Sequence, residues 1–209
     1  MFKEKQKGKF IVFEGIDGSG ISTQTQCLKS KLESEYGIKA VLAKEPSEGP
    51  IGTIIRQVLS RRMVGIDDRS LALLFAADRI DHNQNKIVPV LKKGDFIICD
   101  RYLWSSYAYQ GMKNDNTWIE EINKYAYQPD LTIFIKVQAE TSLKRITGSR
   151  FQTEIFEEIE ILQNVLENYI RLFNQWKYSG KNVVEIDGEQ EQEQVEKDIW
   201  SVIEQYIIK

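Results

Sequence analysis

The chain has 209 residues, of which 42% are hydrophobic and 28% charged, and it carries a formal net charge of −3. This weak acidic balance excludes a general field for nucleic acid, so any phosphate site must be local. Its apolar stretches fall well short of the roughly 20 residues that span a bilayer, and no signal-type apolar run follows the basic first nine residues. We therefore expect one cytoplasmic domain over residues 1–209, with neither nucleic acid nor membrane as a partner.

Apolar, β-branched runs predict strands, and helical patterns lie between them. In chain order, the predicted strands cover residues 9–15, 38–44, 95–100, 130–137 and 181–187. The predicted helices cover 22–37, 51–60, 68–94, 102–111, 116–127, 139–150 and 154–177, and a last one ends the chain. The helix over 68–94 is expected to bend near Pro89 and to stop at Gly94. This alternation predicts an α/β fold, a five-stranded parallel sheet with helices on both faces.

The stretch "GIDGSGIST", residues 15–23, resembles a phosphate-binding loop between the first strand and the first helix. It fits the pattern G-x-x-x-x-G-K-[ST], except that Ile21 replaces the lysine. Such a loop binds phosphate largely through backbone N–H groups and the helix N-terminus, and the hydroxyl of Ser22 is expected to meet Mg²⁺. The residues expected to hold the nucleotide phosphates are Gly15, Gly18, Ser19, Gly20, Ile21, Ser22 and Thr23.

Ile21 removes a positive charge that would face the β- and γ-phosphates. Losing one charge-assisted contact costs about 1.5–3 kcal/mol in binding, and losing a donor aimed at transition-state charge costs on the order of 10²–10³ in rate. Two explanations stay open besides a weakened site. A single-base change of a lysine codon gives isoleucine, so the residue could have been introduced, and another lysine such as Lys44 could compensate.

Several further stretches together resemble the thymidylate kinase family. They are "FEGIDGSG" (13–20), "LLFAADR" (73–79), "DRYLWSSYAYQG" (100–111), "FEEIEILQNVLENYIRLF" (156–173) and "VVEIDG" (183–188). They follow the family order and cover nearly the whole chain, and the second and third are specific among P-loop kinases. The resemblance implies a phosphotransferase that converts ATP and dTMP to ADP and dTDP with Mg²⁺, within a homodimer that has a mobile lid.

The resemblance also implies the site that holds dTMP. Phe75 would stack on the thymine, and Arg79, one helical turn later, would hydrogen-bond a base carbonyl. Arg101 would contact the acceptor phosphate, and Asp100 would serve the Mg²⁺ or its waters. The remaining residues of this expected site are Ser106 near the base, Tyr109 beside the deoxyribose, Asp17 near the sugar and metal, and Arg56 at the acceptor phosphate.

A basic segment around Gly148 resembles the lid, which we expect at about 141–154. Family members without a basic residue in the phosphate loop usually supply arginines from this lid. We therefore expect Arg150 first and Arg145 second to act on the transferred phosphoryl group. Residues 185–189 match the region where the family holds adenine.

Three functions fit this sequence. The first is an active or weakened dTMP kinase, and the second is a kinase for another nucleoside monophosphate. The third is a nucleotide-binding protein with little or no catalysis, which the replacement at Ile21 motivates.

Overall fold

A parallel sheet forms the centre of the molecule, which is a computed structural model that describes residues 8–147 and 155–208. Within those ranges the sheet has five strands, in the order β2-β3-β1-β4-β5, and every neighbouring pair is parallel. The strands are β1 Phe10–Glu14, β2 Ala40–Lys44, β3 Phe96–Asp100, β4 Leu131–Lys136 and β5 Val183–Asp187. The predicted fold class is confirmed, because continuous apolar strands bury both faces of a parallel sheet.

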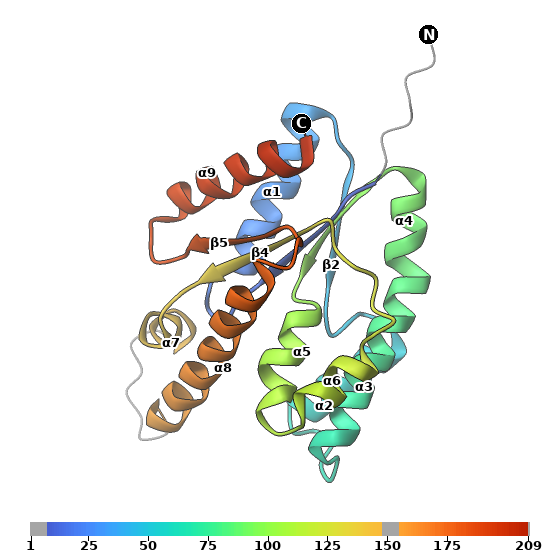
Figure 1. Cartoon of the computed structure of the whole chain (residues 1–209), viewed down its shortest axis with the longest axis vertical. Helices are drawn as coiled ribbons and strands as arrows, with labels where there is room; N and C mark the ends of the chain where they lie inside the picture. Colours follow the sequence, from blue (N-terminus) through green and yellow to red (C-terminus); the bar gives the residue numbers. More distant parts are fainter. Residues whose placement is uncertain (1–7, 148–154, 209) are drawn as a thin grey trace.

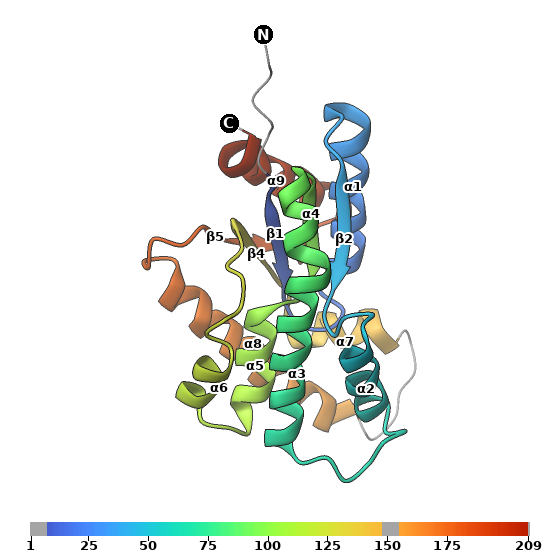
Figure 2. The same cartoon turned by 90° about the vertical axis from the view of Figure 1, so that its right-hand side faces the viewer.

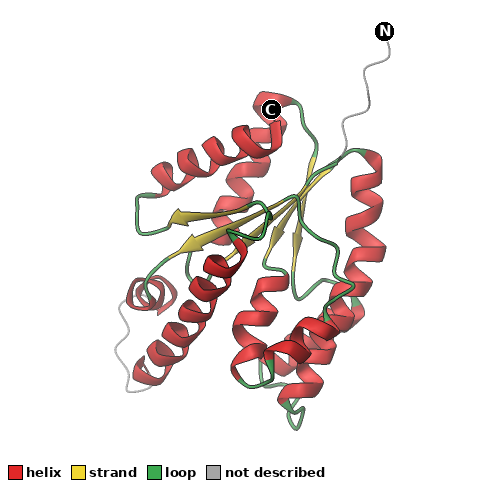
Figure 3. Cartoon of the chain, in the orientation of Figure 1, coloured by secondary structure: helices red, strands yellow, loops and turns green. Residues whose placement is uncertain are grey.

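Helices cover both faces of the sheet (Figures 1 and 3). On one face lie α1 Ile21–Tyr36 and α9 Gln192–Ile203, which bury Leu28 and Ile199 against the strands. On the other face lie α4 Val88–Lys93, α5 Leu103–Tyr109 and α8 Ile155–Trp176. Tyr169 of α8 is fully buried and stacks on Phe134 of β4 at 5.4 Å between ring centroids. The sheet is therefore sealed between two apolar clusters.

Further helices extend beyond the carboxyl ends of the strands, at the bottom of Figure 2. They are α2 Pro50–Leu59, α3 Asp68–His82, α6 Asn116–Ile122 and α7 Ala139–Thr147. A 3₁₀ turn, Gln110–Met112, follows α5, and a π-helical turn, Glu204–Ile208, follows α9. Ligands of such sheets bind beyond the carboxyl ends of the strands, so these helices surround the place where a site is expected.

The helix predicted over 68–94 is divided in the structure. A π-helical turn, Asn83–Ile87, separates α3 from α4, and Pro89 lies in the first turn of α4. Gly94 ends α4 in the left-handed conformation, with φ of 91°, as expected for a glycine C-cap. The departure from α-helical geometry therefore lies just ahead of Pro89, whose missing N–H suits a helix start.

The structure covers the expected lid only in part. Helix α7 reaches Thr147, whereas Gly148 and Arg150 lie outside the described residues. No helix in the described ranges has the length and apolarity needed to cross a bilayer.

Candidate functional site

The loop between β1 and α1 forms a backbone cradle at the carboxyl edge of the sheet. Gly18 and Gly20 have φ of 75° and 93°, in the left-handed region that glycine adopts readily. At Gly18 a Cβ atom would also lie 2.6 Å from the carbonyl oxygen of Ser142, so the loop packs directly against α7. Helix α1 begins right after the loop, at Ile21. A helix N-terminus and a glycine-rich turn therefore face the same space.

A cavity of about 360 Å³ opens at this loop. It is lined by Ile16, Asp17, Gly18, Ser19, Gly20, Ile21, Ser22, Thr23, Lys44, Asp100, Arg101 and Arg145. Of the loop residues predicted to hold phosphate, Gly15 does not line the cavity. Its carbonyl oxygen instead accepts a hydrogen bond of 2.6 Å from Arg101.

Ile21 lies at the position where the loop pattern has lysine. Its side chain is only 5% exposed and belongs to the apolar cluster on the α1 face of the sheet. Ile21 lines the cavity, but most of its side chain packs against the apolar core. The loop therefore presents no side-chain cation of its own, although its backbone geometry is intact.

Ser22 and Asp100 form a hydroxyl–carboxylate pair beside the loop. The Ser22 Oγ donates to Asp100 Oδ2 at 2.5 Å, and Lys44 Nζ lies 3.9 Å from the same carboxylate oxygen. Among the described side chains, those of residues 8–146 and 159–208, no cluster of three or more His, Cys, Asp or Glu could hold a metal. Two hard oxygen donors fit Mg²⁺, because this ion is usually held by one or two carboxylates together with nucleotide phosphates and water.

Arg101 is held in an unusual backbone conformation at the end of β3. Its φ is 67°, a left-handed value that is uncommon for a residue other than glycine. Besides Gly15, its guanidinium contacts Asp17 Oδ1 at 2.8 Å, Tyr169 Oη at 3.3 Å and Ser105 Oγ at 3.4 Å. Burial acts to lower the pKa of Arg101, but neighbouring phenols and carboxylates raise it above its usual range. The side chain is thus a fixed cation.

A second cavity, of about 290 Å³, lies on the other side of Arg101. Five predicted site residues line it, namely Asp17, Phe75, Arg79, Arg101 and Tyr109. Phe75 is partly exposed there, while burial raises the pKa of Tyr109 to about 12. The cavity thus combines aromatic rings with guanidinium groups, a lining that suits a flat, hydrogen-bonding ligand with an anionic group.

Arg79 is one of the most buried side chains of the molecule, at 1% exposed. Its Nε and Nη2 donate to Glu45 Oε2 at 2.9 and 2.7 Å. Its other acceptors are the side chains of Asn123 and Ser106 and the carbonyl oxygen of Tyr102. The protein therefore fixes this guanidinium in place at the wall of the second cavity.

Two predicted residues do not line this second cavity. Ser106 is 2% exposed and accepts from Arg79 Nη2 at 3.0 Å, so it acts on the cavity only through Arg79. Arg56 is exposed on α2, where it donates to the carbonyl oxygens of Pro46 and Ser47. In the structure it ties α2 to the loop that follows β2.

Arg145, at the end of α7, lines both the phosphate-loop cavity and a third cavity of about 310 Å³. Its Nη2 donates to the carbonyl oxygen of Gly188 at 3.0 Å. Ser19, Thr23 and Glu189 line this third cavity with it. The segment 185–189, expected to hold a base, thus lies next to the loop, whereas Arg150 falls outside the described residues.

Sequence reasoning missed the two buried glutamates that organise the site. Glu14 is fully buried and accepts from two backbone N–H groups, at Tyr102 and Trp104. Glu45, which pairs with Arg79, is 3% exposed. Glu14 lies at the end of an apolar run, and Glu45 follows another with only Lys44 between them. A carboxylate in either place signals burial and could have identified both residues.

Two features together define the class of protein. A glycine loop joins a parallel strand to α1, and Arg101 lines both the cavity at this loop and the aromatic cavity. This is the arrangement of a P-loop kinase that acts on a nucleoside monophosphate. The family model of thymidylate kinase matches residues 13–199. This chain therefore belongs to the thymidylate kinase family.

Curated relatives agree with this assignment. A protein of Methanocaldococcus jannaschii is 41% identical over 86% of this chain and 92% of its own length. One of Thermococcus gammatolerans is 35% identical over 96% and 98%, and one of Methanococcus aeolicus is 42% identical over 83% and 84%. All three are named "probable thymidylate kinase".

Proposed function

We propose that this protein transfers the γ-phosphoryl group of ATP to dTMP, forming ADP and dTDP. One observation carries the proposal: in a chain of the thymidylate kinase family, the cavity at the phosphate loop and the aromatic cavity are both lined by Asp17, Lys44 and Arg101. Two nucleotides bound in these cavities would present their phosphates to one another across that shared wall.

The aromatic cavity is the proposed dTMP site. Phe75 stacks on the thymine, and Arg79, aligned by Glu45, faces a base carbonyl, with Ser106 holding Arg79 from behind. Tyr109 packs beside the deoxyribose and leaves no room for a 2′-hydroxyl. Arg101 binds the acceptor phosphate, while Asp17 orients Arg101 through their 2.8 Å ion pair. Arg56 acts indirectly, by fixing the loop after β2.

The phosphate loop is the proposed ATP site. The backbone of Gly18, Ser19, Gly20 and the start of α1 would surround the β- and γ-phosphates, and Thr23 would face the α-phosphate side. Ser22 and Asp100 would hold Mg²⁺, which supplies positive charge to the phosphate oxygens when bound. Arg145 would close over the phosphates from α7, and Arg150 remains a prediction for the same role.

The chemical step needs positioning and charge more than a strong base. A dTMP phosphate oxygen attacks the γ-phosphorus in line, the bond to the β–γ bridging oxygen breaks, and ADP leaves with that oxygen. Arg101 holds the attacking phosphate and shields its charge from the γ-phosphate. Arg145 would stabilise charge on the transferred group, and the helices beyond the strand ends exclude water.

Two further properties belong to the same proposal. The family suggests a homodimer, for which light scattering should give twice the 24.3 kDa of one chain. A cytoplasmic location agrees with the substrates, and fractionation of cells that express the protein tests it.

A coupled ADP-release assay across dTMP, dUMP, dCMP, UMP and AMP tests the substrate. We expect the highest kcat/KM for dTMP. Replacing the stacking ring, Phe75→Ala, should lower kcat/KM for dTMP roughly 5- to 100-fold, the range for loss of one base–aromatic stack. Leu73→Ala, at a residue 49% exposed on the same helix, is the matched control and should change little. Equal turnover of all five acceptors would refute the substrate assignment.

The buried position of Ile21 supports one other candidate, a protein that binds both nucleotides and transfers phosphate slowly or not at all. Calorimetry with dTMP and with ATP, run beside the assay, separates the two functions. Binding without turnover in the native protein, with turnover gained in Ile21→Lys, would favour that second candidate. Ready turnover by the native protein excludes it.

A further inference from the structure

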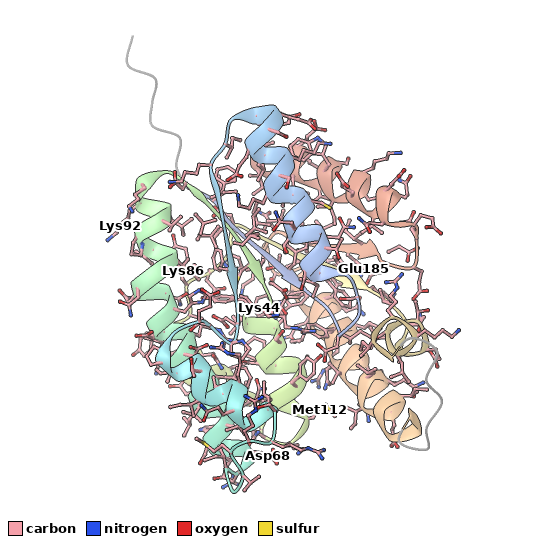
Figure 4. The ribbon with its side chains drawn as sticks, turned by 180° about the vertical axis from the view of Figure 1, so that it is seen from behind. Lys44, Asp68, Lys86, Lys92, Met112 and Glu185 are labelled. Atoms are coloured by element: carbon pink, nitrogen blue, oxygen red, sulfur yellow. The ribbon has the colours of Figure 1, made fainter. Side chains whose placement is uncertain are left out.

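Lys44 lies where the two proposed nucleotide sites meet. It is the last residue of β2 and pairs in register with Asp100 at the end of β3. Figure 4 labels Lys44 at this end of β2, close to the start of α1. Its side chain lines both the phosphate-loop cavity and the aromatic cavity. A cation here faces the path that a transferred phosphoryl group would take.

The charge of Lys44 is weakly engaged in the structure. Its side chain is 63% exposed, and Asp100, 3.9 Å away, is its sole ionic or hydrogen-bonding partner among the described side chains, those of residues 8–146 and 159–208. Arg101, which lines the same two cavities, is by contrast bound by four neighbours, and its side chain is only 16% exposed. Because an exposed ion pair of this length contributes little free energy, Lys44 can leave Asp100 at little cost and bind the more negative oxygens of a phosphate.

Two features of the loop make such a cation necessary. Ile21 leaves the loop without a side-chain charge, and Arg145 enters from the side of Gly188, where one of its N–H groups is already bound. Arg145 also lines the third cavity and not the aromatic one, so it serves the donor side. Among the described side chains, Lys44 and Arg101 are the cations that line both cavities, and Arg101 is already assigned to the acceptor phosphate, so Lys44 is the one left to face the transferred group.

We infer that Lys44 supplies the phosphate-binding charge that the loop lacks at Ile21. Its Nζ turns from Asp100 onto the oxygens of the group passing between the two cavities. The lysine of a P-loop reaches those oxygens from the start of a helix, whereas Lys44 reaches them from the end of β2, two strands away from β1 in the sheet. The inference rests on the proposed kinase activity and assigns this residue a direct part in it.

A set of variants tests the inference by kcat for dTMP. Lys44→Gln should lower kcat about 10²- to 10³-fold, as for loss of a donor to transition-state charge, and Lys44→Arg should keep most of it. Lys39→Gln is the matched control, because Lys39 is 70% exposed and pairs with Asp95 at the opposite end of β2. Lys86→Gln removes the other lysine that lines a pocket together with Lys44; it lies in the π-helical turn Asn83–Ile87 and is labelled in Figure 4. Both should stay within about threefold of the native rate.

The loop variant Ile21→Lys shows whether the two positions share one task. In that background, Lys44→Gln should lower kcat by less than about tenfold, because a loop lysine replaces the lost charge. The inference is overturned if Lys44→Gln behaves like Lys39→Gln, if Lys86→Gln is the slow variant, or if Lys44→Gln has the same effect in both backgrounds. Thermal melting confirms that each variant is folded.

Failure of the inference differs from failure of the proposed function. If the native protein turns over none of the five acceptors, the kinase proposal fails, and calorimetry with ATP, with and without magnesium, then decides the role of Lys44. ATP binding about 10- to 100-fold weaker in Lys44→Gln than in Lys39→Gln supports a phosphate-binding lysine. Equal affinity of these two variants overturns it.

Discussion

At the scale of single residues, the site depends on a charge pair buried beneath it. Glu45 and Arg79 are 3% and 1% exposed, and two guanidinium N–H groups of Arg79 donate to one carboxylate oxygen. Neutralising Glu45 leaves a buried cation without its counter-charge, the costly way to break such a pair. The binding role of Arg79 therefore depends on Glu45.

We predict that Glu45→Gln lowers the free energy of unfolding by about 3 kcal/mol, which is roughly 6–12 °C in melting temperature for a chain of this size. Glu48→Gln provides the control, because the Glu48 side chain is 93% exposed and its change should stay within about 0.5 kcal/mol. Calorimetric melting without ligand measures both. Equal melting temperatures for the two variants would show that the pair adds nothing to stability.

The sequence could identify those site residues whose role is encoded by a short motif around them. Ser22 and Phe75 lie in short motifs whose spacing carries the chemistry, and both line the expected cavities. The role of Glu45 depends on Arg79, 34 positions away, and no local pattern states that pairing. Ser106 was predicted at the base, yet its neighbour Ser105 lines the cavity, since the helical position decides which hydroxyl faces inward.

At the scale of elements, strands and most helices could be predicted, because periodicity and apolar runs are properties of neighbouring residues. The π-helical turn Asn83–Ile87 could not, since its sequence pattern differs little from that of an α-helix. The contact between the phosphate loop and α7 was equally invisible: Gly18 and Ser142 are far apart in the chain, and only the fold brings them together.

That contact gives a prediction for Gly18→Ala. The new methyl group would lie 2.6 Å from the Ser142 carbonyl oxygen and would strain a φ of 75°, so the loop must move away from α7. Gly37→Ala is the control, because its φ is 63° but nothing lies within 4 Å. Both should lose about 1–2 kcal/mol of stability from the left-handed backbone. We expect steady-state kinetics to show a higher KM for ATP in Gly18→Ala alone, and an unchanged KM there would contradict the packing argument.

At the scale of the whole molecule, the site joins segments from most of the chain. The lining of the two proposed nucleotide cavities comes from the ends of β2 and β3, the loops after β1 and β2, and helices α1, α2, α3, α5 and α7. A ligand that contacts all of these binds only the folded chain, so it must raise the stability of the molecule as a unit. Because the two cavities share a wall, each nucleotide also helps to fix the residues that receive the other.

We therefore predict that dTMP at 100 times its Kd adds about 2.7 kcal/mol of stability, or roughly 5–10 °C in melting temperature. A non-hydrolysable ATP analogue at the same excess should do likewise, and both together should give the larger shift. With the 5- to 100-fold weaker binding expected above, Phe75→Ala should cut the dTMP contribution to about 0.4–1.8 kcal/mol at the same dTMP concentration. It should keep the ATP-analogue shift, because the ring lines only one of the two cavities. An undiminished dTMP shift in Phe75→Ala would place the acceptor elsewhere in the molecule, and a UMP shift as large as that of dTMP would contradict the exclusion of a 2′-hydroxyl by Tyr109.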